Sequence, residues 1–524
     1  MLGEPRQFAD LLSRNARLYP SKEGLVADGL RHTWAELDAL VNRAAHGLRS
    51  LGVARGDRVG ILGSNQGSCI VSQFALARLG AVMVAINARL VADEVATILR
   101  DCETSTLLAG DAQLEAARAA AGAAPSVKRL LGLGRGGGEV PAFERVLDEV
   151  EVPPELDQPI RGDELLQLLY TSGTTGFPKG VMYTHAGALA ATLIHVLAIG
   201  SAFHHRVLLP SPLYSAAGLA GVACAIAAGS TMHVIQFELD GALEVLARER
   251  ITFTNLVPTT VRRLVDHPDL TRHDLSALEV LLYGGSPMPE QTLRRASERL
   301  PCGFRQTFAT SETGLAGTVL EPEDHRLALT DPDAAHLLRS CGRPQIGVDV
   351  RLLDDEGLEV TQGEIGEVAV HCAGNMLGYW NRPEETARAL QDGWVRTGDL
   401  ARRDDRGYFY LIDRKHDMIV SGGFNVYPSE VERVLLEQPA VADCAVIGVP
   451  DERWGEAVKA VVVLNSGEVC GGDELIDACR PSLASHKLPK SIDFVDEIPR
   501  NPAGKPLRRQ LREPYWRGRD RRVG

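Results

Sequence analysis

Short apolar segments bounded by glycine alternate with longer amphipathic segments from about residue 33 onward. The segment TWAELDALVNRAAHGLRSLG predicts a helix in which Thr33 is the N-cap, Glu36 completes a capping box and Gly52 ends the helix. The segment DRVGIL that follows, residues 57–62, predicts a buried strand. Repeated alternation of this kind predicts mainly parallel sheets that are flanked by helices.

The same alternation continues through most of the chain. Further buried strands are predicted at AVMVAI (81–86), STLLAG (105–110) and TMHVI (231–235). From about Val348 the predicted strands become shorter and are separated by Gly and Asp turns, which indicates a smaller β-rich unit. After Asp413 helix and strand patterns alternate again, which indicates a separate C-terminal domain.

The predicted fold class is therefore α/β. We expect a large N-terminal domain, residues 1–415, in which mainly parallel sheets flanked by helices are joined to a β-rich subdomain. We expect a small α+β C-terminal domain over residues 416–524. A chain of 524 residues is long enough to bury a separate core in each of these units.

Composition excludes several classes of protein. The hydrophobic fraction of 44% and the charged fraction of 24% are typical of a soluble globular protein. The net charge of −13 argues against a nucleic-acid partner, because phosphate binding requires clustered Lys and Arg. The nine cysteines stand singly and follow no metal-ligand spacing, so we expect buried, reduced thiols in a cytoplasmic protein.

The sequence does not predict a membrane span. Its N-terminus, MLGEPRQFADLL, meets charged residues at once and lacks the apolar core of a signal peptide. Residues 207–237 carry no Asp, Glu, Lys or Arg, but prolines and glycines interrupt them and alanine is the commonest of their apolar residues. A buried helix in an α/β core fits this segment better than a transmembrane helix.

The segment YTSGTTGFPKG, residues 170–180, predicts a phosphate-binding loop. Glycine lets consecutive backbone N–H groups converge on an anion, threonine hydroxyls add donors, and Lys179 supplies a positive charge. The pattern is not the Walker loop, because Pro178 precedes the lysine and Gly180 follows it. A flexible linker is the alternative, but a predicted strand stands immediately before the loop and a helix-like segment after it.

This loop closely resembles the phosphate-binding signature of the acyl-adenylate-forming enzymes, the superfamily of acyl-CoA synthetases, luciferases and peptide-synthetase adenylation domains. Further segments resemble other signatures of that superfamily and occur in the same order. They are YGGSPMP (283–289), QTFATSETG (306–314), WVRTGDL (394–400), DRKHDMIVSGGFNVYPSEVE (413–432) and PRNPAGKPLRR (499–509). The resemblance spans nearly the whole chain, and its collinear order makes chance agreement very improbable.

The resemblance implies that ATP activates an apolar carboxylic acid, fatty or aromatic, to an acyl-adenylate. Transfer to coenzyme A then gives an acyl-CoA, AMP and pyrophosphate. Two alternatives stay open at this point: an amide ligase that passes the acyl group to an amine, and an inactive nucleotide-binding protein. The last predicts the loss of Glu312 or Lys505, and both are present. The oligomeric state is also open, a homodimer included.

The resemblance also assigns the ATP site. Lys505, Glu312 and Lys179 are the expected catalytic residues, and Glu312 and Thr171 are the expected ligands of Mg²⁺, a cation that prefers oxygen ligands. The expected ATP-binding residues are Thr171, Ser172, Gly173, Thr174, Thr175, Gly176, Lys179, Gly284, Gly285, Ser286, Phe308, Ala309, Thr310, Ser311, Asp399, Arg414 and Lys505. Among these, Phe308 is expected to stack on adenine, and Asp399, helped by Arg414, to accept hydrogen bonds from the ribose hydroxyls.

The remaining expected sites belong to the second half-reaction and to the acid. The resemblance implies a mobile C-terminal domain whose hinge aligns with His416. It assigns Ser421, Gly422 and Gly423 to the coenzyme A site, where the two glycines leave room for the pantetheine arm. The expected acyl pocket includes Tyr214, Ser215 and Gly218.

Three positions depart from the commonest pattern of the superfamily. Phe308 stands in place of tyrosine and keeps the ring, and Ser311 stands in place of threonine and keeps the hydroxyl. Tyr214 is followed by Ser215, where many relatives have an aromatic residue followed by histidine. The last departure leaves the gating of the acyl pocket and the second nucleophile open.

Overall fold

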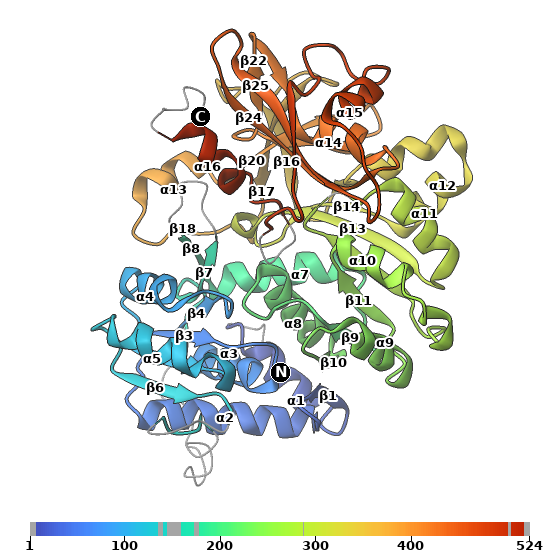
Figure 1. The fold of residues 1–524 in the computed structure, drawn as a ribbon. Coiled ribbons are helices and arrows are strands. Elements are labelled where there is room, and N and C mark those ends of the chain that lie inside the picture. Colours follow the sequence, from blue (N-terminus) through green and yellow to red (C-terminus); the bar gives the residue numbers. More distant parts are fainter. Residues whose placement is uncertain are drawn as a thin grey trace.

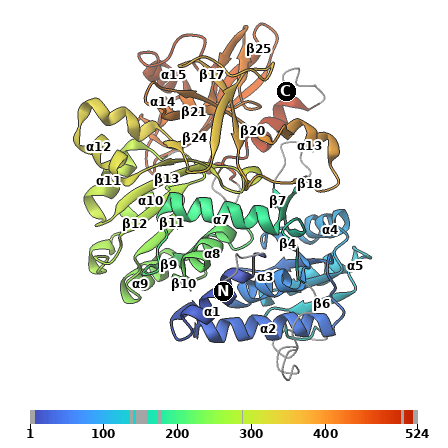
Figure 2. The same ribbon diagram turned by 180° about the vertical axis from the view of Figure 1, so that it is seen from behind.

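The structure is a computed structural model that describes residues 7–134, 140–143, 159–171, 178–286, 288–500 and 505–517. Within these residues the strands form four sheets. Figures 1 and 2 show two large sheets with their helices in the lower and middle parts of the molecule and the C-terminal elements above them. The predicted α/β class with mainly parallel sheets in a large N-terminal region is confirmed.

A seven-stranded sheet contains the first predicted strands. Its order is β18 (Gly378–Tyr379), β8 (Lys179–Thr184), β7 (Leu165–Thr171), β4 (Val82–Ile86), β3 (Arg58–Leu62), β5 (Thr106–Ala109) and β6 (Arg129–Gly132). The strands from β7 to β6 are parallel, whereas β8 and β18 pair antiparallel at one edge. Strands β4 and β5 are buried throughout, as expected for short apolar runs that helices cover on both faces.

A nine-stranded sheet forms the other half of the N-terminal region. Its order is β15 (Arg343–Pro344), β14 (Gly317–Leu320), β13 (Gly303–Ala309), β12 (Val280–Gly284), β11 (Phe253–Leu256), β9 (Arg206–Leu209), β10 (Thr231–Val234), β1 (Glu23–Ala27) and β2 (Leu30–Thr33). The strands from β13 to β1 are parallel. The carboxyl ends of β12 and β13 therefore lie side by side.

Helices cover both sheets. They are α1 (Asp10–Leu18), α2 (Trp34–Ser50), α3 (Gly67–Leu79), α4 (Ala92–Asp101), α5 (Leu114–Gly122), α7 (His185–Ile199), α8 (Ala216–Ala228), α9 (Leu239–Arg248), α10 (Pro258–Val265), α11 (Glu290–Arg299), α12 (Pro322–Thr330) and α13 (Pro383–Ala389). The predicted capping box of α2 is confirmed: Oγ1 of Thr33 accepts from the backbone N–H of Glu36, whose carboxylate accepts from the backbone N–H of Thr33. Gly52 follows the helix with φ +81°.

The uncharged segment 207–237 forms the predicted helix α8 and the predicted strand β10, and its first residues belong to β9, which was not predicted. Among the described residues, none of the helices is both long and apolar enough to span a bilayer.

Two smaller sheets complete the chain. The first contains β16 (Asp349–Leu353), β17 (Ile365–His371), β20 (Trp394–Arg403), β19 (Leu390–Gln391) and β21 (Phe409–Arg414), and it is the β-rich unit expected from about Val348. The second contains β22 (Ile419–Ser421), β23 (Phe424–Val426), β24 (Val441–Asp451), β25 (Gly455–Leu464) and β26 (Ser491–Phe494). Three helices accompany it: α14 (Pro428–Leu436), α15 (Gly472–Cys479) and α16 (Arg508–Trp516).

The C-terminal sheet has a hydrophobic core of its own. Its buried side chains run from Ile419 to Leu488 and come from α14, α15, strands of this sheet and the segment between α15 and β26. A separate core is what an independent domain requires. It supports the proposed boundary at residues 415 and 416, which stays a prediction.

Candidate active site

The phosphate-binding loop connects two paired strands. Thr171 ends β7 and Lys179 begins β8, and the two residues are opposite each other in the antiparallel register. Five expected ATP-binding residues of the loop, Ser172, Gly173, Thr174, Thr175 and Gly176, lie outside the described residues. The structure therefore places the two ends of the loop next to each other, and Lys179 supplies a positive charge at one of these ends.

Tyr379 joins two of the expected catalytic residues. Its phenol donates a hydrogen bond of 2.9 Å to Oε1 of Glu312, and Nζ of Lys179 lies 5.0 Å from the centroid of its ring. Burial, together with the negative charge of Glu312, raises the pKa of Tyr379, so the phenol keeps its proton and acts as a donor. The backbone holds the arrangement as well, because the N–H of Met376 donates to the carbonyl oxygen of Glu312 at 2.8 Å.

Sequence reasoning did not find Tyr379. The residue belongs to the two-residue strand β18, which is added to the edge of the sheet beside β8. Its only local signal is an aromatic pair after glycine in the segment LGYWN. Such a pair is common in strands, so the contact with Glu312 follows only from the tertiary pairing of β18 with β8.

The expected adenine-binding residues lie at the carboxyl ends of β12 and β13. Gly284 ends β12 opposite Thr307, and a side chain at Gly284 would lie 2.7 Å from the carbonyl oxygen of Thr307. Gly285 follows with φ +81°, and Ser286 comes next. Carboxyl ends of adjacent parallel strands are the usual place for a ligand in an α/β sheet.

The turn after β13 carries the other residues of this group. Phe308 and Ala309 end β13 and are partly exposed, and Thr310 follows them as a buried residue. Oγ1 of Thr310 is a buried polar atom without a partner among the described residues. The phenol of Tyr183 donates to the carbonyl oxygen of Ser311 and holds the short helix Ser311–Thr313 that carries Glu312.

Asp399 and Arg414 form an ion pair between β20 and β21. They are opposite each other in the register, and Nε of Arg414 lies 2.6 Å from Oδ1 of Asp399. Burial raises the pKa of Asp399 above its ordinary value, although the positive charges of Arg414 and Lys505 oppose this shift. Oδ2 of Asp399 is buried and lacks a hydrogen-bond partner among the described residues. A buried carboxylate oxygen of this kind suits the hydroxyl groups of a ribose.

Lys505 comes from the C-terminal region, yet it interacts with this group. Burial and the positive charge of Arg414 lower its pKa to about 8, although the negative charges of Asp399 and Glu312 oppose this shift. The charges of Arg414, Asp399 and Glu312 therefore act on Lys505. In the sequence, these residues precede Lys505 by up to about two hundred positions. The fold brings Lys505, Asp399, Arg414 and Glu312 together.

The expected coenzyme A residues are not part of this group. Ser421 is the last residue of β22, and Gly422 and Gly423 form the exposed turn to β23. A Cβ atom on Gly422, at φ +60°, would lie 2.6 Å from the ring of Trp454. His416 is partly exposed, and its Nε2 lies 3.8 Å from Oδ1 of Asp417. The charges of Asp399 and Glu312 thus act on Lys505 in a conformation that leaves the two glycines at the surface.

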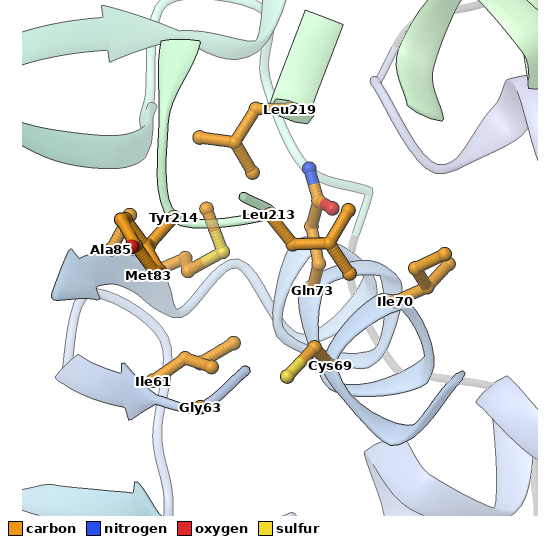
Figure 3. A pocket seen from close by; sticks show the side chains of 10 residues that line it. All are labelled: Ile61, Gly63, Cys69, Ile70, Gln73, Met83, Ala85, Leu213, Tyr214 and Leu219. Carbon is orange, nitrogen blue, oxygen red and sulfur yellow. The ribbon is translucent and has the colours of Figure 1, made fainter. Parts of the chain in front are cut away.

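The expected acyl-pocket residues have different surroundings. Tyr214 lines a small cavity of about 20 Å³, which is about the size needed for one water molecule (Figure 3). The other residues around this cavity are Ile61, Gly63, Cys69, Ile70, Gln73, Met83, Ala85, Leu213 and Leu219. Apart from Gln73 and Cys69 they are apolar or glycine, which suits an apolar group.

Ser215 and Gly218 build the start of α8 instead. Ser215 is the N-cap: its Oγ accepts from the backbone N–H of Gly218 at 3.2 Å and donates to the carbonyl oxygen of Pro212 at 2.7 Å. A side chain at Gly218 would collide with that same carbonyl oxygen. Both residue types are therefore accounted for by the local turn, and their contact with an acid stays a prediction.

The residues present fit a magnesium-bound nucleotide. The unpartnered oxygen of Asp399 lies within β20, the carboxylate of Glu312 follows β13, and the cation of Lys179 begins β8, so the three groups come from three sheets. Carboxylate and hydroxyl oxygens are the ligands that Mg²⁺ prefers, and Glu312 and Thr171 supply both types.

Comparison with known proteins agrees with this arrangement. The family model of the AMP-binding enzymes matches residues 12–380, and that of the AMP-binding enzyme C-terminal domain matches residues 430–505. The chain is 39% identical over 509 residues to a feruloyl-CoA synthase of an Amycolatopsis species, covering 96% of this chain and 98% of that protein. It is 36% identical to the long-chain-fatty-acid–CoA ligase FadD13 of Mycobacterium tuberculosis, covering 96% of this chain and 98% of that protein. The solved structure of the amide bond synthetase McbA from Marinactinospora thermotolerans superposes with a TM-score of 0.85 at 30% identity, covering 96% of this chain and 98% of that one.

Proposed function

The chain belongs to the family of AMP-binding enzymes, and on this premise we propose that it is an AMP-forming acid–CoA ligase. It activates an apolar carboxylic acid, fatty or aromatic, with ATP to an acyl-adenylate and then transfers the acyl group to coenzyme A. The observation that carries the proposal is the contact of Tyr379 with both Glu312 and Lys179 beside the phosphate loop, because only the folded chain joins these three residues. The charges of Asp399 and Glu312 also act on Lys505.

The first half-reaction must bring two anions together. The carboxylate oxygen of the acid attacks the α-phosphorus of ATP, and the bond from that phosphorus to the pyrophosphate oxygen breaks. We assign to Lys505 the neutralisation of the negative charge shared by the acid and the α-phosphate. Lys179 faces the phosphate loop and neutralises charge that develops on the departing pyrophosphate.

The nucleoside is held at two points. Asp399 accepts hydrogen bonds from the ribose through its unpartnered oxygen, while Arg414 holds the other oxygen of the same carboxylate. Phe308 and the glycines Gly284 and Gly285 border the adenine. A magnesium ion bound by Glu312 and Thr171 would supply positive charge at the phosphate oxygens.

The second half-reaction requires a different placement of the C-terminal domain. The thiol of coenzyme A attacks the acyl carbon, the bond to the phosphate oxygen breaks, and AMP leaves. The exposed turn at Gly422 and Gly423 has to reach the adenylate for this step, and we assign the rotation to the segment that contains His416.

Transfer to an amine is the second candidate. The similarity to the amide bond synthetase McbA supports it. So does the Tyr214–Ser215 pair, in which the serine is used as a helix cap rather than as a group that faces the acid.

One experiment tests both proposals. Pyrophosphate release is measured with ATP, Mg²⁺ and a panel of fatty, hydroxycinnamic and other aryl acids, and the products are identified by mass spectrometry with coenzyme A or with simple amines. We expect release with at least one apolar acid, and a thioester when coenzyme A is present. An amide and no thioester would favour the second candidate, and no pyrophosphate with any acid would contradict adenylation itself.

A further inference from the structure

The loop that carries Lys505 is held at both ends by arginines. Before the loop, Arg500 places NH2 at 2.7 and 2.8 Å from the two carboxylate oxygens of Asp443 on β24. After the loop, Arg508 begins α16 only three residues beyond Lys505. The ends are also tied to each other, because the backbone N–H of Leu507 donates to the carbonyl oxygen of Pro499 at 2.8 Å.

Arg508 makes the more buried of the two anchors. Its side chain is 14% exposed, and NH2 lies 2.8 Å from each carboxylate oxygen of Glu432 on α14. NH1 lies 3.2 Å from Oδ2 of Asp417, a residue just after the proposed hinge. Glu432 is itself oriented, because its Oε1 accepts from the backbone N–H of Val446 at 2.8 Å. One guanidinium thus joins α16, α14 and the hinge segment.

Charges from both sides of the proposed hinge face this guanidinium. Burial lowers the pKa of Arg508, but the negative charges of Glu432, Asp413 and Asp417 outweigh burial and raise it above its ordinary value. Asp413 stands before His416 in the chain and Asp417 after it. Arg512, one turn further along α16, also pairs with Asp417, at 3.3 Å. The start of α16 is therefore held by oppositely charged side chains that are only 10–14% exposed.

We propose that Arg508 is a positioning residue for Lys505, because it fixes the start of α16, three residues beyond Lys505, to α14 and to the hinge segment. The inference rests on the proposed function. Three residues can extend over at most about 10 Å, so displacement of Arg508 is transmitted directly to Lys505. Because Lys505 is assigned to the first half-reaction alone, the effect of Arg508 is confined to adenylation.

The test separates the two half-reactions in the full-length protein. Adenylation is followed as pyrophosphate release, and thioester formation is followed from a chemically prepared acyl-adenylate and coenzyme A. We expect Arg508→Gln to slow adenylation by about 10- to 100-fold, because displacement of a reacting group by about 1 Å costs rates of this order. Thioester formation should change by less than about threefold, because it does not use Lys505.

Arg509→Gln is the matched control, because Arg509 is the exposed neighbour and carries the same charge. It should change neither rate. Arg508→Lys should recover part of the adenylation rate, since a point charge pairs with Glu432 but lacks the planar fork. If Arg508→Gln does not fold, Arg500→Gln removes the less buried anchor and should show the same selective loss, smaller in size.

An equal loss in both half-reactions would overturn the inference, and so would an unchanged adenylation rate in a folded Arg508→Gln protein. These outcomes differ from a failure of the proposed function, in which the unsubstituted protein itself releases no pyrophosphate with any acid.

Discussion

The phenol of Tyr379 donates a hydrogen bond of 2.9 Å to Oε1 of Glu312, while its ring faces Nζ of Lys179 at 5.0 Å. One side chain thus orients the proposed magnesium ligand and contacts the lysine of the phosphate loop. The placement depends on β18, in which Tyr379 pairs with Val181 at the edge of the sheet. Tyr379 is therefore expected to set the direction of the Glu312 carboxylate rather than to react.

Tyr379→Phe should weaken catalysis without abolishing it. The ring stays, so its contact with Lys179 stays, but the hydrogen bond to a charged group is lost, which costs about 1.5–3 kcal/mol. We expect kcat/KM for ATP to fall by about 10- to 100-fold and saturation with Mg²⁺ to require a higher concentration. Pyrophosphate release at a series of Mg²⁺ concentrations measures both. Tyr410→Phe, which removes a phenol bound to Asp404, is the control, and an unchanged dependence on Mg²⁺ would contradict the role of Tyr379.

Lys505→Ala should separate the two half-reactions. Removing one dedicated charge stabiliser costs about two to three orders of magnitude in rate, so adenylation should fall by this amount. Thioester formation from a preformed adenylate should survive. Rapid-mixing assays of each half-reaction provide the measurement, with Lys490→Ala as a control on the same domain. Loss of both half-reactions to the same extent would show that Lys505 is not confined to the first.

The pH dependence of adenylation should report the charge of Lys505. Burial and Arg414 lower its pKa to about 8, so the free protein loses the required cation as pH rises through that value. The kcat/KM for ATP reflects groups of the free enzyme and should decline above about pH 8. Lys505→Arg keeps a positive charge at every accessible pH and should remove the decline even if its maximal rate is lower. A profile that is flat from about pH 7 to 9.5 in the unsubstituted protein would contradict the assignment.

Gly422→Ala should affect the second half-reaction selectively. The new methyl group would lie 2.6 Å from the ring of Trp454, at a backbone φ of +60° that disfavours side chains. We expect thioester formation to slow by about tenfold or more and pyrophosphate release to be retained. Gly467→Ala is the matched control, because Gly467 also has a positive φ, +85°, but meets open space. If the two substitutions slowed thioester formation equally, backbone strain alone would explain the effect, and a specific role of Gly422 would be contradicted.

Four buried histidines should make the fold sensitive to mild acid. Burial lowers the pKa of His185, His195, His233 and His325 to about 4, whereas a histidine in the unfolded chain has a pKa of about 6.5. The unfolded chain therefore binds more protons between these values, and these groups reduce the free energy of unfolding as pH falls from about 6.5 to 4.

Each of these histidines lowers the free energy of unfolding by up to about 1.4 kcal/mol for each unit by which the pH falls in this window. Replacing His195 with Gln should reduce the slope by about that amount, as measured by denaturant unfolding at pH 7, 6 and 5. His336→Gln, an exposed histidine, should leave the slope unchanged. An identical slope in the His195 variant and the unsubstituted protein would contradict the prediction.

Much of the local structure was predictable because its causes are local. The capping box of α2 depends on two side chains three residues apart, and the buried strands β3, β4 and β5 are apolar runs of four or five residues. The motif containing Gly284 and Gly285 likewise depends on close approach and on a positive φ at one residue. Ser215 and Gly218 were expected to line the acyl pocket, but the turn before α8 is sufficient to explain both residue types. Local sequence patterns alone do not distinguish these two roles.

The sequence by itself determined the class of fold, the family and the chemical types at the proposed site, because these depend on periodicity and on short ordered motifs. Only the tertiary structure decided that Tyr379 holds Glu312, that the charge of Asp399 acts on Lys505 while Gly422 stays exposed, and that Arg508 pairs with Glu432 and Asp417. These contacts join residues tens to hundreds of positions apart. Their partners are selected by how sheets and domains pack, and no local pattern encodes that packing.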